Sequence, residues 1–163
     1  IRQLFGKLQI LSATFVAYSH GKNDGQNAMG VITMALVAYF GWTTFEVPLW
    51  VILLSGLAIA AGTAYGGWKV IRTLGIRITK LESIHGFAAE TSAASIIEAA
   101  SLFGLPVSTT HTISSAIMGV GATKRLSAVR WGVTGNIVFA WMVTYPICFV
   151  VGLVLAWALK ALF

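Results

Sequence analysis

The 163 residues of this chain are 57% hydrophobic and only 10% charged, with a mean hydropathy of +0.83, whereas an ordinary soluble domain carries roughly 25% charged residues. Lipid is therefore the expected solvent. The net charge of +6 does not indicate nucleic-acid binding, because the lysines and arginines lie between apolar stretches and form no basic face among aromatic residues.

The chain begins Ile1-Arg-Gln-Leu, without an initiator methionine or a signal-peptide pattern, and we expect it to be a piece of a longer protein. Its first apolar stretch, residues 4–39, is long enough to cross a bilayer core of about 30 Å. A polar run from Tyr18 to Asn27 interrupts it. A continuous lipid-facing helix would not carry such a run, so we predict a broken transmembrane helix whose unwound residues are buried in protein or line a watery cavity.

The segment Gly21-Lys-Asn-Asp-Gly-Gln-Asn27 carries the chemistry of this predicted break. Its glycines permit unwound backbone, and oxygen and amide ligands of the kind that hard cations prefer are supplied by Asn23, Asp24, Gln26 and Asn27. Asn23 and Asp24 are therefore a candidate sodium site. An acidic residue inside an apolar span favours an ion path, because charge there costs at least about 2.5 kcal/mol. A capped loop between two helices is the alternative.

Residues 48–68 and 131–159 are uncharged apolar runs, and both are predicted to be full transmembrane helices. A basic loop at residues 69–82 follows the first run, and three further cations, Lys124, Arg125 and Arg130, precede the second. Both basic loops are expected in the cytoplasm. An even number of crossings must then separate them.

Between these loops, residues 83–121 are split by Gly104-Leu-Pro106 into two arms, each with about 13 uninterrupted apolar-biased residues and too short for a full crossing. We predict a re-entrant helical hairpin; two thin transmembrane helices would satisfy the same charge pattern. With one hairpin and three crossings, the chain belongs in the cell membrane as a multi-pass segment, with its N-terminus cytoplasmic and its C-terminus outside. A second copy of such a unit, next in a chain, would be inverted.

The hairpin tip, Pro106-Val-Ser-Thr-Thr-His111, begins its second arm with a proline, which suits the first turn of a helix. The free N–H groups and hydroxyls of Ser108, Thr109 and Thr110 are expected to bind an oxyanion. Hydrogen bonding between helices is the alternative. His111 is interpreted as a phosphate donor, a proton carrier or an interior hydrogen-bonded histidine.

Glu90 and Glu98 lie on the first arm of the hairpin, deeper than surface charges are expected. Either is a candidate for cation binding or proton coupling. For Glu90 the alternative is a carboxylate at the helix entry, with Lys80 as its partner.

At these residues the chain resembles the inorganic phosphate transporter family, whose repeated signature is a G-x-N-D-x-x-N break and a G-x-P-[VI]-S-T-T-H hairpin tip. The likeness covers nearly the whole chain and is closest to the family's C-terminal repeat. It departs from the usual pattern at Gly25-Gln26 and Glu98. The matching positions are Gly21, Asn23, Asp24 and Asn27, then Gly104, Pro106, Val107, Ser108, Thr109, Thr110 and His111, with Gly86-Phe and Glu90 at the hairpin entry.

The resemblance implies an all-α integral membrane fold in which two inverted repeats pack around one midplane site. This chain would be one inverted-repeat unit, with a broken transmembrane helix, two full transmembrane helices and a re-entrant hairpin. The complementary repeat is expected in the same full-length polypeptide or in a second copy of this chain, and a homodimer is left open.

The implied function is cation-coupled symport of inorganic phosphate by alternating access, with sodium or protons as the coupling ion and no cofactor. The alternatives are a permease for sulfate or another oxyanion and an anion channel. An intramembrane serine enzyme is not expected, because Ser108 and His111 are three residues apart on one short arm. We assign phosphate binding to Asp24, Asn27, Ser108, Thr109, Thr110 and His111, and cation binding or coupling to Asn23, Asp24, Glu90 and Glu98.

Overall fold

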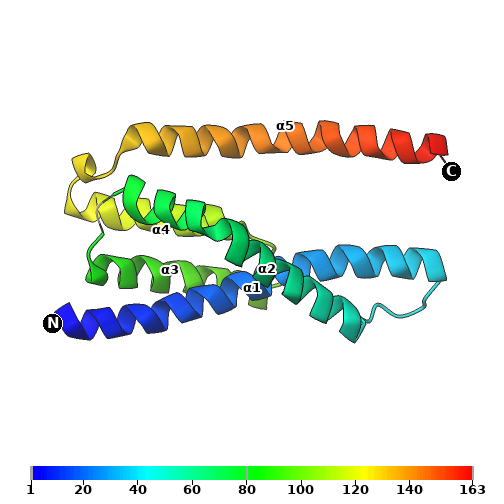
Figure 1. Ribbon diagram of the computed structural model, residues 1–163, viewed down its shortest axis with the longest axis horizontal. Coiled ribbons are helices and arrows are strands. Elements are labelled where there is room, and N and C mark those ends of the chain that lie inside the picture. The colour runs from blue at the N-terminus through cyan, green and yellow to red at the C-terminus, as the bar shows by residue number, and fades with distance from the viewer. Residues whose placement is uncertain (1, 80, 163) are drawn as a thin grey trace.

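The computed structural model describes residues 2–79 and 81–162, and its long elements are all helices (Figure 1). No strand occurs among the described residues, which confirms the all-helical class. A π-helical turn, η1, extends the second helix, and a 3-10 turn, η2, links the fourth helix to the fifth. The elements are α1 (Arg2–Phe40), α2 (Leu49–Arg72), η1 (Thr73–Arg77), α3 (Ser83–Leu102), α4 (Thr109–Lys124), η2 (Leu126–Ala128) and α5 (Trp131–Leu162).

Helix α1 is continuous, so the predicted break at residues 21–27 is wrong. The polar side chains of this segment find partners on the hairpin without any unwinding: Lys22 pairs with Glu98, and Asn23 bonds the backbone of Val107. Because these contacts are made sideways by side chains, the backbone of α1 keeps its own helical hydrogen bonds. A polar run inside an apolar segment requires protein or water beside it, but not a broken helix.

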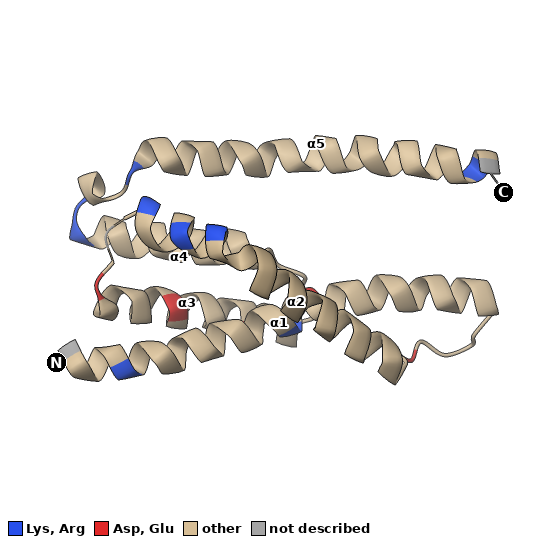
Figure 2. Cartoon of the chain, in the orientation of Figure 1, with Lys and Arg blue, Asp and Glu red and all other residues tan. Residues whose placement is uncertain are grey.

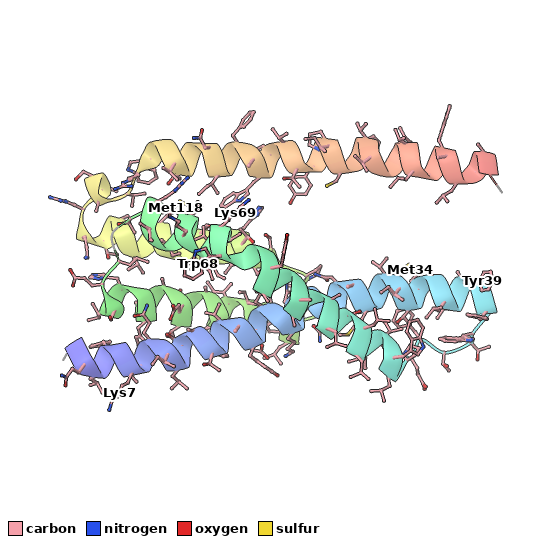
Figure 3. All side chains as sticks on the ribbon, in the orientation of Figure 1. Lys7, Met34, Tyr39, Trp68, Lys69 and Met118 are labelled. Atoms are coloured by element: carbon pink, nitrogen blue, oxygen red, sulfur yellow. The ribbon has the colours of Figure 1, made fainter. Side chains whose placement is uncertain are left out.

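Two helices among the described residues have the length and apolar composition of membrane spans, Leu49–Arg77 and Trp131–Ala161. They contain or closely match the predicted spans at residues 48–68 and 131–159. Their large apolar side chains are mostly exposed, and those of α5 stand out along the helix, which lies apart from the others over most of its length (Figure 3). An exposed apolar surface of this extent fits a hydrocarbon solvent.

Helices α3 and α4 form a helical hairpin joined by residues 103–108. The hairpin lies along the first half of α1, and α3 runs in the same direction as α1 (Figure 1). Phe5 contacts Phe87 edge to face with ring centroids 5.8 Å apart, while Lys22, farther along α1, reaches Glu98, farther along α3. The arms are 20 and 16 residues long, longer than the uninterrupted apolar runs suggested.

Helices α1 and α3 approach closely at Gly86. A Cβ atom at this position would lie 2.2 Å from Nε2 of Gln9. Beyond the hairpin tip, the second half of α1 packs near α2 instead, where a Cβ at Gly25 would lie 3.8 Å from Cδ1 of Ile59. Helix α1 therefore supports the hairpin with one half and α2 with the other.

The base of the hairpin is closed by a small apolar core of Ile78, Ala89, Ile117 and Val129. Figure 2 shows lysines and arginines gathered at this end of the molecule, where α1 and α5 begin and α2 and α4 end. Lys7, labelled in Figure 3, is among them. The positive-inside rule associates such an end with the cytoplasm, and the orientation in the membrane stays a prediction.

Candidate functional site

The two sequence motifs meet where the hairpin tip reaches the middle of α1. Asn23 is 3% exposed, and its Nδ2 donates to the carbonyl oxygen of Val107 at 2.7 Å. The Val107 N–H donates in turn to Oδ1 of Asn23, at a long 3.5 Å. One side-chain amide thus pairs with both backbone groups of a tip residue. Asn23 therefore fixes the tip against α1.

The tip turns sharply before α4 begins. Gly104 has φ +67°, a left-handed conformation that glycine adopts at little cost. Ser108 is the N-cap of α4, and its hydroxyl oxygen accepts the N–H of His111 at 3.3 Å. The cap uses one of the four N–H groups that a helix start leaves without helical partners. The others stay at the N-terminus of α4, where the helix dipole favours an anion.

Asp24 lies beside this N-terminus. Thr109, which is buried, places its Oγ1 3.5 Å from Oδ1 of Asp24. Nδ1 of His20 lies 2.9 Å from Oγ1 of Thr109 and 3.3 Å from Oδ2 of Asp24. Nδ2 of Asn23 also donates to Oδ1 of Asp24, at 3.0 Å. The carboxylate is therefore held in place by neighbours from both α1 and α4, while 39% of its side-chain surface stays exposed.

From sequence, His20 flanks the expected break and is a candidate to orient Asp24, but it is not among the assigned site residues; the structure places it at the centre of the contacts. The available signal was its spacing: His20 and Asp24 are four residues apart, which brings them together on one face of an unbroken helix. Because a break was expected at residues 21–27, this helical spacing could not be used to assign His20 a direct contact with Asp24.

His111 is not brought to Asp24. It lies two residues after Thr109, which is about 200° around the helix, and its ring packs on Trp141 of α5 with centroids 4.0 Å apart. It lines a cavity of about 450 Å³ between α3 and α4, with Ser92, Ile96, Thr112, Ser115 and Ala116. With His111 on this side and the Ser108 hydroxyl capping α4, a triad of Ser108, His111 and Asp24 is not assembled.

Two other predicted phosphate residues are exposed. Asn27 lies one turn beyond Asn23 on α1, and Thr110 lies in the first turn of α4. Their positions adjoin Asn23 and Thr109, so they border the same region. Among the described residues, neither forms a hydrogen bond with Asp24. Their role in phosphate binding stays a prediction.

The predicted coupling residues fall into separate places. Glu90 accepts a hydrogen bond from Ser12, and Ser12 precedes Asp24 by about three helical turns, or roughly 18 Å along α1. Lys80, the alternative partner of Glu90, lies outside the described residues. The structure therefore separates Glu90 from the tip.

Glu98 is much nearer the tip and forms an ion pair with Lys22. Its second oxygen, Oε2, is buried and has no hydrogen-bond partner among the described residues. Lys22 was not predicted as its partner, because α1 was expected to be unwound there. No group of three or more His, Cys, Asp or Glu side chains that could hold a metal ion occurs in the described part of the chain. Besides the Asp24 carboxylate, a sodium ion at Asn23 and Asp24 would thus depend on amide, hydroxyl and backbone oxygens.

The comparisons with known proteins agree with the motifs. A family model described as the phosphate transporter family matches residues 1–152. A probable low-affinity inorganic phosphate transporter of Rhizobium meliloti is 51% identical over 144 residues, covering 87% of this chain and 43% of that protein. One of the same description from Bacillus subtilis is 41% identical over 160 residues, covering 98% of this chain and 48% of that protein.

A solved structure, titled the sodium-dependent phosphate transporter, is also similar. It superposes with a TM-score of 0.78 at 39% identity and covers 89% of this chain but 37% of its own. The chain thus spans less than half the length of these relatives.

Proposed function

Because the chain belongs to the phosphate transporter family, we propose that it forms one half of a secondary transporter that carries inorganic phosphate together with a cation. The observation that carries the proposal is the contact of the hairpin tip with α1, which holds Asp24, His20 and Thr109 at the N-terminus of α4. This arrangement puts an anion-favouring helix end and a cation-favouring carboxylate side by side.

The depth of the contact supports a site near the membrane midplane and a re-entrant hairpin. Lys7 and Tyr39 lie near the two ends of α1 (Figure 3). A helix between them is roughly 48 Å long, close to the thickness of a bilayer with its headgroups, about 40–45 Å. Asn23, which holds the hairpin tip, is midway between them in sequence. A tip that stops at this depth re-enters the membrane without crossing it.

The exposure of polar groups at this depth supports the second half of the transporter. Asp24 is partly exposed, and Asn27, Ser108 and Thr110 are exposed. Lipid does not tolerate such groups, so protein or water must cover them. The complementary inverted repeat would do so and contribute its own tip and carboxylate. The likeness of the motifs supports the assignment of this chain as the C-terminal repeat.

The chemistry of coupling follows from charge. Phosphate would bind the first-turn N–H groups of α4, with hydroxyls of Thr109 and Thr110 completing its shell. The Asp24 carboxylate repels a dianion in a low-dielectric site, so a cation binds at Asn23 and Asp24 before the anion is stable there. Each net positive charge that moves inward then releases about 2.3 kcal/mol at −100 mV. We take sodium as the coupling ion, since the similar solved structure is titled sodium-dependent.

Uptake by the full-length protein in proteoliposomes tests this function. Labelled phosphate is offered with a sodium gradient and a pH gradient imposed separately, and with unlabelled sulfate as competitor. Asp24→Asn keeps the size of the side chain but removes its charge, and should abolish concentrative uptake. Glu46→Gln, the same chemical change at an exposed position outside the site, is the matched control and should accumulate phosphate normally.

Normal accumulation by the Asp24→Asn variant would refute the proposed coupling. Uptake that never exceeds the external concentration in the unaltered protein would identify a channel instead. Accumulation driven by the pH gradient alone would assign the coupling to protons. Strong competition by sulfate would show that the substrate is not phosphate alone but a wider class of oxyanions.

A further inference from the structure

A second polar site lies at the base of the hairpin, at the opposite end from the tip. The loop after η1 and the link between α4 and α5 enclose a cavity of about 540 Å³ there. Its lining residues are Thr79, Lys124, Arg125, Ser127, Ala128 and Arg130. This cavity takes no part in the phosphate and cation chemistry proposed above.

The wall of this cavity is ordered by backbone contacts. The N–H of Arg130 donates to the carbonyl oxygen of Ile78 at 2.9 Å, which ties the α4–α5 link to the loop after η1. Thr79 and Val129 are each 3% exposed, and a Cβ at Gly121 would lie 2.9 Å from Cγ2 of Val129. The basic side chains are therefore carried by a closely packed scaffold from three parts of the chain.

The charge of the cavity is strongly positive. Three cationic side chains line it, Lys124, Arg125 and Arg130. Among the described residues, the one ion pair that these side chains form is between Lys124 and Glu82, with Nζ and Oε1 3.6 Å apart. Arginine guanidinium groups match the paired oxygens of a phosphate group in bidentate geometry. A phosphate mono- or diester is therefore the chemical class that the lining fits.

Exposed apolar side chains border the charged lining. Leu126 is 70% exposed and Trp131 is 53% exposed, and the indole N–H of Trp131 donates to the carbonyl oxygen of Leu126 at 2.8 Å. Tryptophan is enriched where a membrane meets water, with its ring among the headgroups. A free phosphate ion would gain nothing from these neighbours, whereas the acyl chains of a lipid would cover them.

We propose that the cavity between the η1 loop and the α4–α5 link binds the phosphate headgroup of an anionic phospholipid from the leaflet at the basic end of the molecule. Basic pockets between membrane helices are suited to such headgroups. A charge excess alone would attract the leaflet as a whole, but the concave wall, the two arginines and the apolar border favour one bound lipid.

Lipid titration of the purified full-length transporter tests the proposal. Native mass spectrometry and thermal unfolding in detergent are followed with added phosphatidylglycerol, phosphatidylcholine or inorganic phosphate. Phosphatidylglycerol should bind and raise the midpoint of unfolding, and phosphatidylcholine should do so at least ten-fold more weakly. The double variant Arg125→Gln, Arg130→Gln should lose at least ten-fold of the affinity for phosphatidylglycerol.

The matched control is Lys69→Gln, Arg72→Gln, which removes the same charge at the same end of the molecule, on α2 rather than in the cavity. It should keep its lipid affinity; an equal loss in this control would show a general charge effect and overturn the proposal. Undiminished lipid binding in the arginine variant would overturn it as well. Stabilisation by millimolar phosphate without lipid, lost in the arginine variant but kept in the Lys69→Gln, Arg72→Gln control, would assign the cavity to the free ion, because phosphate bound at the hairpin tip would stabilise both variants. If the double variant does not fold, the single exposed substitution Arg125→Gln carries the test, with a several-fold loss expected.

Discussion

Replacing Asn23 with alanine should release the hairpin tip from α1. In the native chain the Asn23 amide donates to the Val107 carbonyl at 2.7 Å and accepts the Val107 N–H at 3.5 Å. Alanine removes both bonds while keeping a residue that favours helix. The second bond is long enough to count for little, so most of the loss comes from the unpaired carbonyl of Val107. Removing one partner of such a group costs about 1–3 kcal/mol, or roughly 5- to 150-fold in the docking equilibrium of the tip.

Hydrogen exchange measured by mass spectrometry reads this equilibrium directly. In the full-length protein, peptides covering residues 103–110 should exchange about 5- to 150-fold faster in the Asn23→Ala variant, while peptides from the base of the hairpin keep their native rates. Asn27→Ala is the control for docking, because Asn27 is exposed on the same helix. Its effect on tip exchange should be small. Equal exchange of the tip in the native protein and in Asn23→Ala would refute the inference that this amide holds the tip.

Two further predictions concern packing and charge. Gly121→Ala should destabilise the protein by roughly 1–2 kcal/mol, since a Cβ there would lie 2.9 Å from Cγ2 of the β-branched Val129 and overpacking costs more than alanine gains in a helix. Gly119→Ala, on the same helix, places its Cβ in open space and should not destabilise the protein. Equal melting temperatures of the two variants in detergent would contradict the packing argument. Lys22→Met should lower the melting temperature by leaving the Glu98 carboxylate without its partner. Adding Glu98→Gln to this variant should restore part of the lost stability. A double variant less stable than Lys22→Met alone would show that the two charges are not coupled.

The spans and the hairpin were predictable from sequence because they depend on length and on local backbone signals. An uncharged apolar run of 20 or more residues has few alternatives to a membrane helix. Gly104 and Pro106 indicate the end of one helix and the start of the next, and Gly104 has a positive φ in the structure. The basic loops then fixed the expected side of the membrane without knowledge of any contact.

The continuity of α1 could not be predicted in this way. Whether the polar run up to Asn27 unwinds depends on what lies beside it, and its partners Glu98 and Val107 are more than 70 positions away in sequence. The same limit kept His20 out of the assigned site, because its spacing from Asp24 predicts a contact only on an intact helix. It also left the surroundings of His111 open, since its ring packs on Trp141 of α5, a contact that the local sequence does not show.

The unbroken helix α1 restricts how the proposed transporter can move. A helix interrupted at the site would provide a hinge, so that its two halves could tilt independently as each side of the membrane opened. Here Asp24 lies in the middle of one continuous helix, which has basic residues near its start and aromatic residues at its end. Sharp bending in a helix requires a local defect, and residues 21–27 are regular helix. In the proposed transport cycle, displacement at Asp24 would therefore be transmitted along α1 to both of its ends at once, so that opening one side and closing the other would become a single motion.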